Sequence, residues 1–174
     1  MIRLGRGKWK GHILRPACRC RPTCSVTREA VFDILGPGWM EARIVWDLCC
    51  GSGALGIESL SCGAGRCSFV DLSARALKGV LQFLREREAS ERAVTKRCDV
   101  RRAPELLEKP VDLVFMDPPY RSLELYDWAS SYNWEDLLSS DGVVFVEGTA
   151  KMSLPGWRKR RYGASALFQR ECAS

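Results

Sequence analysis

Several features that define common protein classes are scarce in this sequence. Histidine occurs once, at His12 in a basic segment, which leaves no histidine-based catalytic triad. No apolar run approaches the ~18 residues of a membrane span, and the first residues hold no continuous apolar stretch of the kind that a signal peptide needs. We therefore expect a cytoplasmic protein that does not associate with membranes.

Cysteine is present, but without the spacing that disulfide-bonded or zinc-binding proteins show. The nine cysteines are odd in number and irregularly placed, so we expect reduced thiols. Cys18, Cys20 and Cys24 lie close together, and with His12 they would offer four metal ligands. Paired C-x-x-C or H-x-x-x-H spacing is missing, however, and we predict no bound metal.

The net charge of +6 is concentrated at one end of the chain. Residues 1–30 hold eight Lys or Arg against Glu29 alone, and the remainder holds nineteen against twenty acids. Cationic side chains gain free energy by releasing counterions from a nucleic acid, although a basic run is often only solvated surface. We predict a nucleic-acid-binding arm that uses Lys8, Trp9, Lys10, Arg15, Arg21 and Arg28. A second basic cluster, Arg158–Arg161, is open to the same two interpretations.

Hydrophobic periodicity predicts strands and helices in alternation. The expected strands span residues 43–47, 67–71, 93–99, 111–116 and 142–148, followed by a hairpin of 157–163 and 165–171. The expected helices span 25–35, 53–64, 74–89, 103–109 and 122–139. This alternation implies a three-layer α/β/α sandwich around a mostly parallel sheet. We place one boundary near residue 38, between an N-terminal extension (1–38) and the main domain (39–174).

The stretch DLCCGSGALG, residues 47–56, fits the dinucleotide pattern G-x-G-x-x-G. It follows the first expected strand of the main domain, where sheets of this kind bind ligands. Gly51, Ser52 and Gly53 would let the backbone turn tightly and approach a cofactor. Asp47 suits the cationic amino-acid part of S-adenosylmethionine better than the pyrophosphate of NAD, but the loop by itself does not exclude NAD.

Two further aspartates close the second and third expected strands. Asp71 lies at the spacing of a ribose-binding acid, with Leu72 beside it, and its carboxylate would accept from both ribose hydroxyls. Its alternative role is to cap the next helix. Asp99 is placed to accept from the adenine amino group, with the Val100 N–H facing a ring nitrogen. An ordinary turn aspartate is the alternative there.

The stretch DLVFMDPPY, residues 112–120, ends the fourth strand with a motif suited to amino-group methylation. A nucleobase amino group is a poor nucleophile because its lone pair is delocalised into the ring. If the Asp117 carboxylate and the Pro118 carbonyl each accept one N–H, the lone pair is directed at the methyl donor. Pro118 and Pro119 hold the turn rigid, and Tyr120 offers a flat face to a flipped base. An ordinary Pro-Pro turn is the alternative.

These motifs together resemble the bacterial 16S rRNA guanine-N2 methyltransferases that modify guanine 966. The resemblance runs over nearly the whole chain, through GKWKGHIL, RPTCSVTREAVFDIL, DLCCGSGALGIESLSCGA, DLVFMDPPY and GVVFVE. It implies a class I, Rossmann-like methyltransferase fold with a seven-stranded, mostly parallel sheet and an antiparallel last strand. A small basic β-hairpin and a helix would precede this fold.

The resemblance also implies roles for individual residues. The cofactor would be S-adenosylmethionine, and the substrate one guanine of 16S rRNA in a partly or fully assembled small subunit. We expect a monomer. The resemblance implies that Asp47, Gly51 and Gly53 belong to the cofactor loop, that Asp71 binds the ribose and that Asp99 contacts the adenine. It also implies that Asp117, Pro118 and Tyr120 form the guanine site and that the arm Lys8–Arg28 binds RNA.

The sequence departs from the family pattern in a few places. Cys49 and Cys50 stand where the family commonly has an aromatic and a small residue, which we expect to alter packing more than binding. The family often has Glu at the position of Asp71. Glu147 and Asp136 are expected to be surface or sheet-end residues.

Other functions remain open at this point. Adenine-N6 DNA methyltransferases share the catalytic motif but normally carry a recognition domain for which 174 residues leave no room. Glutamine methyltransferases typically show Asn in place of Asp117. A nicotinamide-dependent oxidoreductase would explain the glycine loop, but no catalytic Tyr-Lys or His-Asp arrangement accompanies it. A non-catalytic RNA-binding module would not need both motifs.

Overall fold

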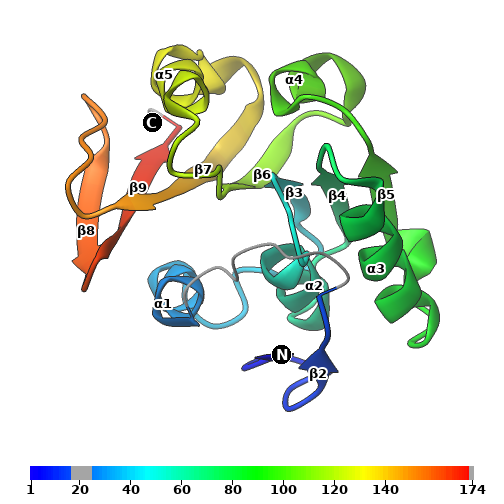
Figure 1. The fold of residues 1–174 in the computed structure, drawn as a ribbon. Coiled ribbons are helices and arrows are strands. Elements are labelled where there is room, and N and C mark those ends of the chain that lie inside the picture. The colour runs from blue at the N-terminus through cyan, green and yellow to red at the C-terminus, as the bar shows by residue number, and fades with distance from the viewer. Residues whose placement is uncertain (17–24, 173–174) are drawn as a thin grey trace.

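A seven-stranded sheet organises the computed structural model, which describes residues 1–16 and 25–172 (Figure 1). Its spatial order is β5-β4-β3-β6-β7-β9-β8. The strands are β3 (Ile44–Leu48), β4 (Arg66–Val70), β5 (Ala93–Lys96), β6 (Val111–Met116), β7 (Leu138–Thr149), β8 (Arg158–Tyr162) and β9 (Ser165–Glu171).

Strand direction confirms the predicted fold. The β5, β4, β3, β6 and β7 strands are mutually parallel, and β9 lies antiparallel between β7 and β8. The side chains of β3 explain its central place, because Val45, Trp46 and Leu48 are all fully buried. A strand that is apolar on both faces needs cover on both sides.

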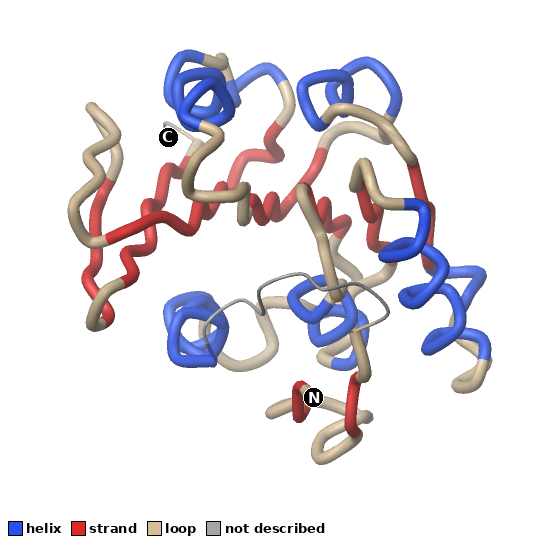
Figure 2. The backbone as a smooth tube through the Cα atoms, in the orientation of Figure 1, coloured by secondary structure: helices blue, strands red, loops and turns tan. Residues whose placement is uncertain are grey.

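Helices cover the two faces of the sheet, so the three-layer prediction is confirmed (Figure 2). One face carries α1 (Ser25–Leu35), α2 (Ala54–Ser61) and α3 (Ala74–Arg85), and the other carries α4 (Ala103–Leu106) and α5 (Leu123–Ser131). Short 3₁₀ turns lie at Ser90–Arg92, Val100–Arg102 and Trp134–Asp136. Within the described ranges, none of the helices has the length and apolar character needed to cross a bilayer.

The predicted helix over 122–139 is wrong in its second half. It ends at Ser131, and a 3₁₀ turn at Trp134–Asp136 leads into β7. Trp134 is fully buried, and its indole N–H donates to the Ala129 carbonyl at 2.8 Å. The chain therefore turns back so that this large ring packs against the end of α5 instead of continuing the helix into solvent.

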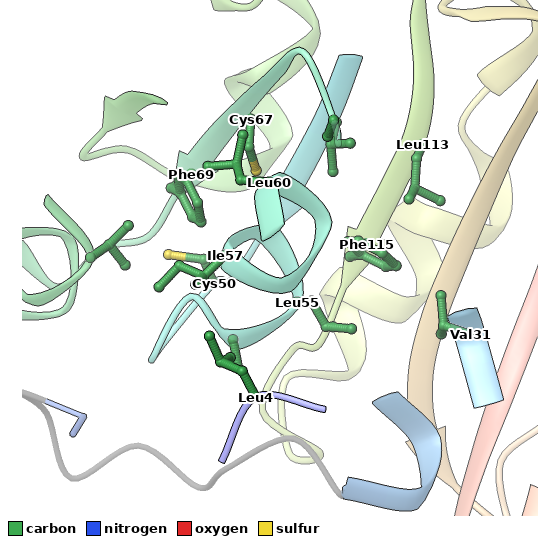
Figure 3. Packing of buried hydrophobic residues seen from close by; sticks show 14 of the residues in the cluster. Leu4, Val31, Cys50, Leu55, Ile57, Leu60, Cys67, Phe69, Leu113 and Phe115 are labelled. Atoms are coloured by element: carbon green, nitrogen blue, oxygen red, sulfur yellow. The ribbon is translucent and has the colours of Figure 1, made fainter. Parts of the chain in front are cut away.

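The core on the α2 side depends on a close approach between α2 and β4. Figure 3 shows Ile57 and Leu60 of α2 beside Cys67 and Phe69 of β4. A Cβ at Gly56 would lie 2.4 Å from the Phe69 ring and 2.6 Å from the Cys67 sulfur. Only glycine permits this helix-to-sheet distance, so the third glycine of the loop motif serves packing.

The N-terminal extension forms the predicted hairpin, β1 (Ile2–Arg3) antiparallel to β2 (Ile13–Leu14). Its apolar side chains Ile2, Leu4, Trp9 and Leu14 are buried in the same core cluster as α2 and α3. The boundary near residue 38 stays a prediction about organisation, since no break in the core marks it.

Glu58 of α2 anchors this extension. Its Oε2 lies 2.8 Å from Arg28 Nε, and its Oε1 accepts the Gly5 N–H at 2.7 Å. Arg28 also donates to the Arg3 carbonyl at 3.0 Å. Burial raises the pKa of Glu58, and the charge of Arg28 opposes that rise. The extension is therefore held by an interior ion pair as well as by apolar contact.

Two predicted nucleic-acid contacts are corrected by this packing. Arg28 and Trp9 are each only 4% exposed. The guanidinium of Arg28 is committed to Glu58, and the Trp9 ring packs edge-on against Phe83 at 6.1 Å between centroids. Both side chains serve the fold and are inaccessible to a phosphate or a base.

We expect Glu58→Gln to lower the free energy of unfolding by about 3–5 kcal/mol, because the Arg28 charge would remain buried without its counter-ion. Urea denaturation measures this loss. The control, Asp33→Asn, breaks the exposed Arg6–Asp33 pair and should cost less than about 1 kcal/mol. Equal losses in the two variants would contradict the anchoring role of Glu58.

Candidate active site

The two sequence motifs meet at one edge of the sheet. β3 and β6 are parallel neighbours, with Leu48 opposite Met116, so the turns that follow them leave side by side. The N–H of Asp117 donates to the Leu48 carbonyl at 3.3 Å. Strand order reverses here, because β4 lies on one side of β3 and β6 on the other. Open α/β sheets bind ligands at such a switch point.

A cavity of about 650 Å³ opens at this switch point, a volume typical of small-molecule sites. The turns after β3, β4, β5 and β6 line it together with the start of α5. All four predicted catalytic residues line it, and so do all the predicted cofactor residues except Asp47 and Gly53. The lining residues are Cys49, Cys50, Gly51, Ser52, Asp71, Leu72, Ser73, Asp99, Val100, Arg101, Asp117, Pro118, Pro119, Tyr120, Ser122, Glu124 and Leu125.

Asp47 and Gly53 do not line the cavity but fix the shape of the glycine loop. Gly53 has φ of 71°, and a Cβ there would lie 2.5 Å from the Val80 side chain, so this turn requires glycine. Asp47 is 2% exposed, and its Oδ2 accepts the Gly56 N–H at 2.9 Å. Burial raises the pKa of Asp47 well above its usual range. The expected contact of Asp47 with the amino-acid part of the cofactor is not supported, because its carboxylate holds the first turn of α2.

Asp71 holds the same loop from the cavity side. Its Oδ2 accepts the Gly51 N–H at 2.8 Å, and its Oδ1 accepts the Ser73 N–H at 2.7 Å. The helix cap itself is Ser73, whose hydroxyl accepts the Ala76 N–H at 3.2 Å. Leu72 beside it is 69% exposed. Leu72 therefore presents an apolar side chain at the rim of the cavity.

Asp99 faces the cavity together with a residue that the sequence argument missed. Its carboxylate accepts from the Arg101 backbone N–H at 2.9 Å and from the guanidinium of Arg101 at 2.5 and 3.0 Å. The bond to the Arg101 side chain holds the pKa of Asp99 below its usual value. The i, i+2 spacing in DVR was the available signal for this pair.

Cys49 and Cys50 complete the loop as apolar lining. Burial raises the pKa of both thiols, so they stay protonated. Cys49 also has φ of 57°, a left-handed conformation that is rare for a side chain with a Cβ.

The Asp117–Tyr120 turn is fixed by a tyrosine from α5. The buried Tyr126 hydroxyl lies 3.1 Å from the Pro118 carbonyl and 3.1 Å from the Glu147 carbonyl, and its proton is shared between them. A carbonyl has two lone pairs, so Pro118 retains one for a substrate. Sequence reasoning missed Tyr126, since no motif marks a tyrosine that acts through its hydroxyl.

Glu147 was expected at the surface or at a sheet end, and the structure places it near the end of β7 but in the interior. It is 3% exposed on β7, beside the strand that leads into Asp117. The Tyr120 hydroxyl lies 3.4 Å from Glu147 Oε1 and 3.2 Å from Ser165 Oγ. Tyr120 is half-buried, and polar groups of β7 and β9 therefore fix its ring.

The charge of the cavity selects the kind of ligand. Among residues 1–16 and 25–172, four carboxylates line it, from Asp71, Asp99, Asp117 and Glu124, and the one lining cation, Arg101, is paired with Asp99. The Gly51 N–H, which a dinucleotide loop would offer to a phosphate, is already bound by Asp71. A pyrophosphate would be repelled here, whereas the net positive charge of S-adenosylmethionine fits.

The predicted nucleic-acid arm is only partly described. Lys8, Lys10 and Arg15 are exposed, as a phosphate contact requires. Arg21 lies outside the described residues, as do Cys18, Cys20 and Cys24. In the part of the chain that the structure describes, no group of three or more metal-ligating side chains comes together.

A glycine turn and an Asp-Pro-Pro-Tyr turn that face one acidic cavity, in a sheet whose last strand runs antiparallel, define a class I methyltransferase. The chain belongs to the family described as Conserved hypothetical protein 95, whose model matches residues 2–168.

Relatives of known name agree with this class. The chain is 30% identical to ribosomal RNA small subunit methyltransferase D of Escherichia coli (strain K12), over 98% of this chain and 90% of the relative. It is 31% identical to a Bacillus subtilis (strain 168) protein provisionally named rRNA methyltransferase YlbH, over 95% and 96%. The solved structure of yhhF from Escherichia coli, provisionally named a methyltransferase, superposes with a TM-score of 0.80 at 25% identity, over 99% of this chain and 98% of that one.

We expect Asp71→Ala to weaken the binding of S-adenosylhomocysteine roughly ten- to a hundredfold, because the loop and the ligand would both lose charge-assisted hydrogen bonds. Isothermal titration calorimetry measures the dissociation constant. The control, Asp127→Ala, removes an exposed carboxylate of α5 and should leave it unchanged. Binding of NAD in place of S-adenosylhomocysteine would contradict our interpretation of the cavity.

Proposed function

We propose that this protein transfers a methyl group from S-adenosylmethionine to the exocyclic N2 of one guanine in 16S rRNA. It acts as a monomer in the cytoplasm, on partly or fully assembled small ribosomal subunits. The observation that carries this proposal is the rigid Asp117–Tyr120 turn on the wall of an acidic cavity. Small-subunit rRNA as the substrate is supported by the name of the Escherichia coli relative, and the choice of guanine rests on the motif resemblance.

The cavity residues divide into a cofactor side and a substrate side. Asp71, Leu72, Asp99 and Val100 belong to the turns after β4 and β5, and we assign them to the ribose and the adenine. S-adenosylmethionine, when bound, supplies the electrophilic methyl group. The turn after β6 then remains for the base that accepts it.

Two acceptors on this turn act on the guanine amino group. The Asp117 carboxylate accepts one N–H, and the second lone pair of the Pro118 carbonyl accepts the other. This arrangement localises the nitrogen lone pair and aims it at the methyl carbon. Asp117 takes the amino proton as the C–N bond forms and the C–S bond breaks, then passes it to water. Because Tyr126 holds the Pro118 carbonyl in place, this acceptor needs little reorganisation in the transition state.

Tyr120 holds the base in place for this step. Its hydroxyl is tied to β7 and β9, so the ring is a fixed platform. Stacking on an aromatic ring contributes about 1–3 kcal/mol per base. A base inside a duplex does not reach such a platform, so we assign the target to an unpaired or flipped nucleotide.

The decisive experiment uses small subunits from cells that lack their own guanine-N2 enzyme, together with labelled S-adenosylmethionine. We expect the wild-type protein to form N2-methylguanosine in 16S rRNA. Asp117→Ala should lower kcat about 10²- to 10⁴-fold, because it removes the proton acceptor. Asp127→Ala serves as the matched control and should keep full activity.

Nucleoside mass spectrometry reads the outcome. N6-methyladenosine in place of N2-methylguanosine would overturn the choice of base. Cofactor binding with no labelled rRNA would overturn the substrate and leave the methyltransferase class intact. Full activity of Asp117→Ala would overturn the catalytic assignment.

Tyr126→Phe removes only the hydroxyl that holds the Pro118 and Glu147 carbonyls. We expect kcat to fall by up to about tenfold, the value of one hydrogen bond, while the affinity for S-adenosylhomocysteine stays unchanged. Single-turnover kinetics and calorimetry separate these two effects. A change in cofactor affinity with unchanged kcat would show that Tyr126 supports the cavity in general and does not position the acceptor.

A further inference from the structure

A second concave surface lies between α3 and β5, the edge strand of the sheet. This groove, of about 530 Å³, has an apolar floor that includes Leu77 and Leu81. Its rim carries the cations Lys78, Arg85 and Arg97 against one acid, Glu86. A cationic rim over an apolar floor is the pattern of a site for an anionic, partly apolar polymer.

The chain segment that forms this groove is positively charged. Residues 74–102 hold nine Lys or Arg against four Asp or Glu, a net charge of +5. The other residues of 31–174 carry more acids than bases, and this excess cancels the positive charge of residues 74–102 in the total for 31–174. Lys78 and Arg85 are exposed, and neither has an ion-pair partner among residues 1–16 and 25–172. Their charges are available to a ligand.

The end of α3 contacts the N-terminal hairpin. Arg87, just beyond α3, donates from Nε to His12 Nδ1 at 3.2 Å, and its guanidinium lies 3.5 Å from the Phe83 ring centroid. Trp9 packs against the same ring. Figure 1 shows the hairpin and α3 on the same side of the sheet. The hairpin and the end of α3 are therefore packed together.

One end of the groove adjoins the cofactor cavity. Ala74 lines the groove, whereas Leu72 and Ser73 line the cavity, so a single turn separates the two. Arg97 from the groove donates to the Leu72 carbonyl at 3.1 Å. The groove therefore begins at the edge of the active site.

We propose that this groove binds the sugar-phosphate backbone of the RNA substrate beside the methylated nucleotide. The inference rests on the proposed function, since it names a further contact surface for the same substrate. Lys78, Arg85 and Arg97 pair with phosphates, and the apolar floor packs against sugars. Such contacts position an RNA without reading its sequence.

The double charge reversal Lys78→Glu with Arg85→Glu tests the proposal. We measure the dissociation constant of small ribosomal subunits for labelled protein at several KCl concentrations. Affinity should fall at least about tenfold, and the slope of log K against log[salt] should become shallower by about 1–2, because two phosphate contacts are lost. The affinity for S-adenosylhomocysteine should not change.

The matched control reverses Arg66 and Lys109, two exposed cations beside the amino-terminal ends of β4 and β6, opposite the sheet edge that holds the cavity. It should bind subunits as the wild type does. An equal loss in both double variants would overturn the groove, because the effect would then follow net charge alone. Should the reversal not fold, Lys78→Gln with Arg85→Gln removes the same charges and should give the same change in slope.

The outcomes also separate this proposal from the proposed function. A wild-type protein that binds cofactor but neither binds nor labels subunits overturns both. A wild type that labels guanine, with unchanged affinity and salt slope in the groove variants, overturns the groove alone.

Discussion

The site depends on two carboxylates that hydrogen-bond to the backbone of one glycine loop. Asp47 binds the Gly56 N–H from inside the molecule, and Asp71 binds the Gly51 N–H from the cavity side. Burying Asp47 disfavours its charge, and the amide at the first turn of α2 offsets part of that cost. Because the loop is held at both ends, α2 begins at one fixed point and the lining of the cavity follows from it.

That fixed helix also carries the N-terminal extension. α2 presents Glu58 to Arg28 and Gly5, and it presents Ser61 to the backbone of Arg6 and Trp9. The same short helix therefore starts at the cofactor loop and anchors the hairpin. Its close approach to β4 through Gly56 leaves little freedom for either end to shift alone. The position of the exposed hairpin cations is thereby tied to the position of the active site.

The sequence predicted the parts of this arrangement that depend on local pattern. Strand β6 and the turn that follows it combine a continuous apolar run with a proline pair, and both can be recognised without knowing any contact. Glu58, Tyr126 and Glu147 gave no such signal, because their roles depend on partners that lie 8 to 53 residues away in the chain. Arg28 and Trp9 were misassigned for the same reason, since a basic or aromatic residue near other cations shows its charge or ring in the sequence but not its burial.

The distribution of charge follows from the two ligands that the enzyme must hold. A cavity lined by four carboxylates favours a cationic cofactor and repels the phosphates of an RNA. An RNA substrate therefore gains nothing by entering with its backbone, and only a neutral base benefits from the Asp117–Tyr120 turn. The phosphates need cations outside the cavity but close to it, and we propose that exposed cations of the hairpin and of α3 supply them. Separation of acidic interior and basic surface thus selects which part of the nucleotide enters, before any base-specific contact is made.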